Sequence, residues 1–108
     1  MGNNSEDFLS ELADKIDEVI LKNIEKQLKL PGMLNWILMY YGELLSLLMD
    51  DERTLMEPEK LTGSKDKLEG IKEKLSLIIM GCMGVAKTLK VDLHNPIVET
   101  LKRIEEDC

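Results

Sequence analysis

The sequence predicts an all-α protein, and three observations support this fold class. Apolar residues recur at spacings of three and four in several segments, whereas β-branched residues never alternate at the period of two that is typical of strands. The segment 34–49, LNWILMYYGELLSLLM, is apolar on almost every side, which is typical of a buried helix. Turn and cap residues separate the periodic segments. With 108 residues, we expect a single domain over 1–108.

Segment 34–49 is predicted to be the central helix of a packed bundle. It follows Pro31-Gly32, interpreted as the turn into this helix, and it stops at three consecutive acids. It is shorter than the roughly 20 apolar residues that span a bilayer, so we expect no membrane partner. One neighbour cannot bury such a helix, and we expect it to be buried all round. Glu43 then places a carboxylate in an apolar helix, where it needs a cation, a metal or several donors.

The remaining helices follow from periodicity and caps. A first amphipathic helix is predicted over about 5–28, a third over about 65–89, and a last one with Asn95 as its cap and Pro96 in its first turn. Between the second and third helices lies an irregular stretch, 50–66. It is expected to hold a short turn near 54–57 and to end with Ser64 as a cap.

Glycines inside the predicted helices indicate close packing. A glycine in a helix interior costs about 1 kcal/mol relative to alanine, and close approach of another helix is the usual compensation. Gly81 and Gly84 are therefore predicted to face another helix, and Gly42 is predicted to let one come near.

Composition excludes some partners and favours others. The net charge of −7 argues against DNA or RNA binding, which depends on lysine and arginine contacts to phosphates, but it leaves a free nucleotide open. Hydrophobic residues make up 44% of a small chain, so we expect a partner surface, most simply a second copy in a dimer or a dimer of dimers.

Cys82 and Cys108 lack metal-ligand spacing and are expected to be free thiols. With the polar N-terminus MGNNSEDF, this favours a cytoplasmic location.

Several strings resemble one family of helical enzymes. DKIDEVILKNI, the segment from Leu34 through GELLSLL, KLTGS and LSLIIMGCMGVAKTLKVDL are similar, in this order, to the MazG-like nucleotide pyrophosphohydrolases. The resemblance covers nearly the whole chain. It implies a four-helix chain whose helical hairpins pack into a four-helix-bundle core on dimerisation.

The resemblance also implies a metal site. In the family, E-x-x-E on the second helix and E-x-x-D on the third hold Mg²⁺, which binds a nucleoside triphosphate and activates water to release pyrophosphate. Here the first pair falls on Tyr40 and Glu43, and the second falls on Lys74 and Leu77. One of the four acids therefore remains.

A shift of one residue on the third helix restores a second acid. It places Glu73 and Ser76 at the ligand positions. The candidate site accordingly contains Glu43, Lys74, Tyr40 and Glu73. We expect the ammonium of Lys74 to take the place of the metal and to pair with Glu43 inside the bundle.

Three functions stay open on the sequence alone. The first is a catalytically impaired MazG-like chain that acts as an oligomeric helical scaffold or a nucleotide-binding protein, with no cofactor. The second is an active Mg²⁺-dependent nucleoside triphosphate pyrophosphohydrolase that produces a nucleoside monophosphate and pyrophosphate. It would use Glu43 and Glu73, with acids from the 50–59 loop of a partner chain, as metal ligands. The third is an unrelated helical protein-interaction module.

Overall fold

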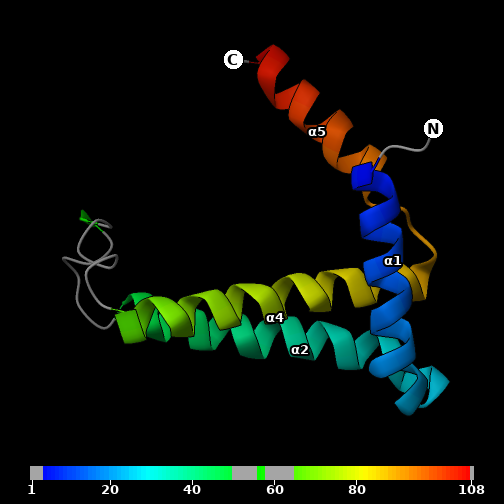
Figure 1. Ribbon diagram of the computed structural model, residues 1–108, viewed down its shortest axis with the longest axis horizontal. Coiled ribbons are helices and arrows are strands. Elements are labelled where there is room, and N and C mark those ends of the chain that lie inside the picture. Colours follow the sequence, from blue (N-terminus) through cyan, green and yellow to red (C-terminus); the bar gives the residue numbers. More distant parts are fainter. Residues whose placement is uncertain (1–3, 50–55, 58–64, 108) are drawn as a thin grey trace. The chain divides into compact units, whose positions relative to one another are not determined.

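The computed structural model describes residues 4–49, 56–57 and 65–107. Within these ranges the chain forms α-helices and one 3-10 helix and contains no strand, which confirms the all-α prediction. The turn expected near 54–57 and the Ser64 cap fall wholly or largely outside the described residues. The elements are α1 (Asn4–Val19), η1 (Leu21–Asn23), α2 (Lys26–Leu48), α4 (Lys65–Leu89) and α5 (His94–Asp107) (Figure 1).

The boundary between the first two helices differs from the prediction. Helix α1 ends at Val19, whose carbonyl accepts a hydrogen bond of 2.9 Å from the Asn23 side-chain amide, and the chain is extended at Ile24. Pro31 lies inside α2, not at a turn. It falls only one and a half turns after the start of the helix. There its missing N–H removes a single intrahelical bond, to the carbonyl of Gln27, and the helix continues through it.

The chain divides into two compact units, one of which lies within Gly32–Cys82 and contains a helical hairpin. In this hairpin α2 and α4 run side by side in opposite directions (Figure 1). The indole N–H of Trp36 donates a 2.7 Å hydrogen bond to the carbonyl of Leu77. The Trp36 ring also meets Tyr40 edge to face, with ring centroids 5.2 Å apart. Trp36 is half-buried with its polar atom satisfied, as expected for a packing residue.

Gly81 marks a close approach between the two helices. A Cβ built at Gly81 would lie 2.6 Å from Ile37 Cγ1 and 2.8 Å from Trp36 Cδ1. The prediction that Gly81 faces another helix is confirmed. Gly42 differs, because no atom lies within 4 Å of a Cβ built there. The expected approach to Gly42 is therefore not made within the described residues.

Helix α2 is not buried all round, and this expectation was wrong. Met33 is completely buried and Leu44 nearly so, but Leu38 is 68% exposed. The reason is geometric: within its unit α2 has one neighbouring helix, which covers only one side. The large apolar residues that stay exposed on α2 are Leu28, Leu34, Leu38, Met39, Tyr41 and Leu45.

The second unit consists of the residues up to Pro31 and those from Met83 on. Its buried apolar residues are Ile16 of α1, Leu21 of η1, and Met83 and Ala86 of α4, and α1 contacts α5. Helix α5 begins at His94, whose backbone N–H donates 3.2 Å to the carboxylate of Asp92, so Asp92 provides the cap predicted for Asn95. Pro96 lies in the first turn, as predicted. None of the residues of α5 is buried.

Over the described ranges, none of the helices combines the length and the apolar character needed to cross a bilayer.

The close approach at Gly81 generates the first prediction. Gly81→Ala should lower the free energy of unfolding by about 1–3 kcal/mol, because the added methyl group collides with Ile37 and with an indole held by its hydrogen bond. The measurement is urea unfolding followed by circular dichroism.

Gly32→Ala is the matched control. Gly32 lies inside α2 with nothing within 4 Å of a built Cβ, so alanine should raise stability by up to about 1 kcal/mol. Equal stabilisation by both substitutions would contradict the close packing at Gly81.

Candidate functional site

The four predicted site residues meet around the ammonium group of Lys74. Its Nζ lies 2.9 Å from Glu43 Oε1 and 3.4 Å from Glu73 Oε1. It also lies 5.6 Å from the centroid of the Tyr40 ring, within the range of a cation–π contact. The ion pair predicted between Lys74 and Glu43 is therefore present.

The register of the hairpin places these groups together. Trp36 is joined to Leu77 by its hydrogen bond, which fixes how far α2 is shifted along α4. One turn further along α2 comes Tyr40, and one turn back along α4 comes Lys74, on the same faces as the bonded pair. Beyond Glu43 the helices come close again at Gly70, where a built Cβ would lie 3.4 Å from Leu47 Cδ1. The ion cluster thus lies between two packed contacts of one helix pair.

The cluster is more exposed than expected. The side chain of Lys74 is 19% exposed, but that of Glu43 is 46% and that of Glu73 is 69% exposed. The prediction that the pair lies inside the bundle is wrong for the single chain, because α4 covers only one side of α2. The hydrogen bond to Glu43 raises the pKa of Lys74 above its ordinary value, partly opposed by desolvation. Lys74 therefore stays charged across the physiological range.

A hollow of about 440 Å³ opens beside the pair. Glu43 and Lys74 line it together with Ser46 and Leu47, which lie one turn after Glu43 on α2. Ser46 and Leu47 were not predicted from the sequence, although their spacing of three and four from Glu43 is the signal that places them on its face of the helix.

The arrangement suits an ion pair better than a metal ion. Glu43 and Glu73 are the two acids predicted as metal ligands, and both direct an oxygen at the same ammonium. A divalent cation held by these oxygens would lie against a fixed positive charge, which disfavours its binding. Within the described part of the chain, histidine, cysteine and acidic side chains form no group of three that could hold a metal ion.

The ion pair generates the second prediction. Lys74→Met should lower the melting temperature by a few degrees, because it leaves the Glu43 carboxylate beside an apolar side chain. Lys72→Met is the matched control, since Lys72 lies on the same helix in an exposed pair with Glu69 and should change the melting temperature little. Equal effects of the two substitutions would show that the Lys74 pair contributes nothing specific.

The pH dependence has a defined sign. A lysine whose pKa is raised on folding contributes stability that is fully present below its unfolded pKa of 10.5 and is lost as the pH rises through the higher folded value. The difference in melting temperature between wild type and Lys74→Met should therefore be constant from pH 7 to 9 and shrink above pH 10.5.

Comparisons with known proteins add no relative. A scan against protein-family models, a search of curated proteins and a search of solved structures each found no match to this chain.

Proposed function

We propose that the protein is a self-associating helical scaffold of the MazG-like type, in which Lys74 has replaced the catalytic metal ion. The ion cluster is the first observation that supports this proposal. By the resemblance, Lys74 stands at the position of a family ligand, and its ammonium engages Glu43 and Glu73, the two carboxylates that a metal would need. A site arranged in this way stabilises the hairpin but offers no activated water.

The second supporting observation is an apolar stripe on α2. The residues that are buried or face α4 include Met33, Ile37 and Leu44. In each case the next residue in sequence is apolar and exposed. Because one residue turns a helix by about 100°, these neighbours form a continuous stripe beside the α4 contact. The stripe consists of Leu34, Leu38, Tyr41 and Leu45, with spacings of four, three and four.

Helix α4 repeats the same pattern. Lys74 and Gly81 face α2, and each is followed by an exposed apolar residue, Leu75 after Lys74 and Cys82 after Gly81. These residues belong to a second apolar stripe, on α4. Ile79 lies between them in this stripe and is 56% exposed. Successive residues of the α4 stripe are four and three positions apart, as in the α2 stripe.

Both stripes lie on one face of the hairpin. On each helix, stripe residues come directly after residues that face the other helix, so both stripes are rotated by about 100° from the contact between the helices. The two helices run in opposite directions. Equal rotations about antiparallel axes bring both stripes to the same side. We call this side, formed by the α2 and α4 stripes, the hairpin face.

A second copy of the chain is the occupant that the hairpin face fits best. A two-fold axis would place two hairpin faces against each other, so that four helices enclose one core. Spacings of three and four are those of knobs-into-holes packing between helices. No charged residue interrupts either stripe between its first and last members. Assembly would also bury the side of α2 that the single chain leaves exposed.

The third prediction tests this assembly by sedimentation equilibrium. Wild type should be a dimer or a dimer of dimers, and Leu38→Glu should shift it towards the monomer by placing a charge in the hairpin face. Met39→Glu is the matched control, because Met39 is exposed on the same helix but outside the stripe. A monomeric wild type, or equal dissociation by the two variants, would contradict the proposal.

The fourth prediction concerns catalysis. Pyrophosphate release from canonical and modified nucleoside triphosphates should not exceed the buffer background with either Mg²⁺ or Mn²⁺, because Lys74 holds the acids that a metal needs. Release that Glu43→Gln abolishes would instead establish an active pyrophosphohydrolase with an unconventional ligand set.

A further inference from the structure

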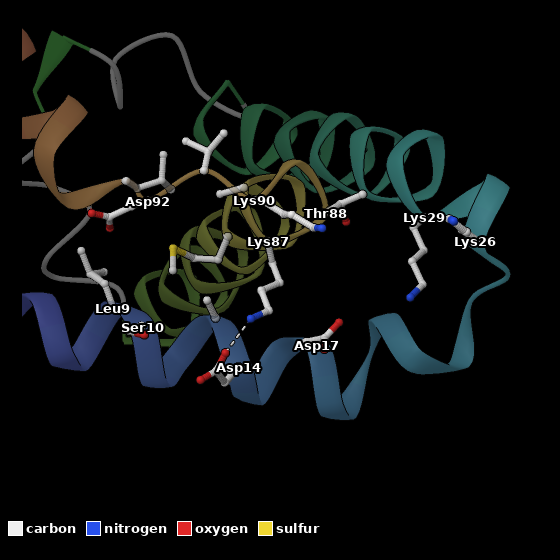
Figure 2. Close-up of a pocket in the computed structure, with 15 residues that line it drawn as sticks. Leu9, Ser10, Asp14, Asp17, Lys26, Lys29, Lys87, Thr88, Lys90 and Asp92 are labelled. Carbon is white, nitrogen blue, oxygen red and sulfur yellow. Dashed lines mark hydrogen bonds and ion pairs between the residues drawn. The ribbon is translucent and has the colours of Figure 1, made fainter.

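A larger cavity lies in the other unit. Its volume is about 1040 Å³, large enough for a small organic molecule. Helix α1, the first turn of α2 and the end of α4 with its following turn surround it (Figure 2). The fifteen residues that line it all belong to this unit. They include four lysines, three aspartates and a set of aliphatic side chains.

One lysine of the cavity is held in place by α1. The Nζ of Lys87 lies 2.7 Å from the Asp14 carboxylate, as the dashed line in Figure 2 shows. This hydrogen bond raises the pKa of Lys87, and the more distant charge of Asp17 adds to the effect. The pair fixes a positive group at the wall of the cavity.

The other cavity lysines are not neutralised. Lys26, Lys29 and Lys90 have no ion-pair partner among the described residues, and Asp17 is the one lining acid without a hydrogen bond. Asp92, by contrast, is used as the cap of α5. Figure 2 shows the amino group of Lys29 directed into the space between α2 and α1. In a protein of net charge −7, this cavity therefore carries an excess of positive charge.

Lys90 adds an independent observation. It has a φ of 59°, and among the described residues other than glycine it alone has a positive φ. It ends α4 in a Schellman motif, in which Val91 N donates to Ala86 O at 2.8 Å and Lys90 N to Lys87 O at 3.2 Å. Glycine is the usual residue at this position because a side chain costs about 1–2 kcal/mol there. The strained residue lines the cavity, which indicates that its ammonium group has a use.

The apolar lining restricts the ligand further. It is aliphatic, with the thioether of Met83, and none of the fifteen lining residues is aromatic. The cavity therefore offers no ring on which a nucleobase could stack. The aliphatic part consists of Leu9, Ala13, Met83, Ala86, Val91 and Leu93.

We propose that this cavity binds a small amphiphilic anion, an aliphatic chain that ends in a phosphate or a carboxylate. The head group lies among Lys26, Lys29, Lys87 and Lys90, and the chain lies against the aliphatic lining. The proposal does not depend on self-association, because the hairpin face belongs to the other unit.

The test is a titration of the full chain, followed by ¹H–¹⁵N correlation spectra and by calorimetry at 50 mM salt. The probes are octyl phosphate and octanoate below their micelle concentrations, inorganic phosphate, adenosine monophosphate and vesicles that contain phosphatidic acid. Octyl phosphate, octanoate or both should saturate a site whose shifted amides lie in 9–17, 26–29 and 83–93. Inorganic phosphate should bind at least about tenfold more weakly, since each buried methylene adds about 0.8 kcal/mol.

Two double variants distinguish binding in the cavity from a general effect of net charge. Lys26→Gln with Lys29→Gln should weaken binding about tenfold or more, by removing two cations from the head-group site. Lys65→Gln with Lys72→Gln changes the net charge equally at exposed positions of α4 outside the cavity and should leave the affinity within about twofold. Equal losses in the two double variants, or no saturable binding of either chain-bearing probe, would overturn the proposal.

Lys90→Gly distinguishes a ligand-binding role of Lys90 from a purely structural role. It should raise the melting temperature, because glycine relieves the left-handed conformation, and at the same time weaken octyl phosphate binding. A gain in stability with unchanged affinity would overturn the role of Lys90. Tighter binding of adenosine monophosphate than of octyl phosphate would overturn the ligand class. Binding only to vesicles that contain phosphatidic acid would identify a membrane lipid rather than a free anion, and would overturn the proposal of a small ligand.

Discussion

The described part of the hairpin depends on the close approach of α2 and α4 at Gly81. Because residue 81 has no side chain, Ile37 and Trp36 reach the surface of α4, and the indole N–H of Trp36 meets the carbonyl of Leu77. This contact fixes both the distance between the helices and their register. The register in turn brings Lys74 opposite Glu43, one turn away. A bulkier residue at position 81 would therefore disturb the ion cluster without touching it.

The same register leaves an apolar surface exposed. A helix that is apolar on nearly all sides needs neighbours on nearly all sides, and α4 supplies one. The exposed side of α2 is not irregular, since it follows the contact side residue by residue and has its counterpart on α4. Isolated apolar residues on a surface are ordinary, but a continuous stripe at spacings of three and four on two adjacent helices is typical of an interface.

The sequence predicted features that depend on local pattern and on pairing along the hairpin. The bounds of α4 and the Lys74–Glu43 ion pair are confirmed, because periodicity sets the first and the E-x-x-E and E-x-x-D spacing of the resemblance indicates the second. The break after Val19 was missed because Pro31 is the stronger turn signal. The signals for a break after Val19 are the β-branched pair at 19–20 and the cap from Asn23, and in the sequence both are weaker than the proline. Burial of α2 was overestimated, since the sequence does not show which neighbours lie within one chain.

The two candidate sites differ in their charge. Around Lys74, one ammonium is held by two carboxylates, and the adjacent hollow is lined by Glu43 and Lys74 as its only charged residues among those described, so it offers a phosphate no unpaired cation. In the other unit, three lysines without ion pairs face one aspartate, so the cavity favours an anion. An acidic protein gains nothing in solubility from such a cluster of lysines, and holding Lys90 in a left-handed conformation adds a cost in stability. Ligand binding is the explanation that accounts for both features. On the two proposals, anion recognition and self-association belong to different units of the chain.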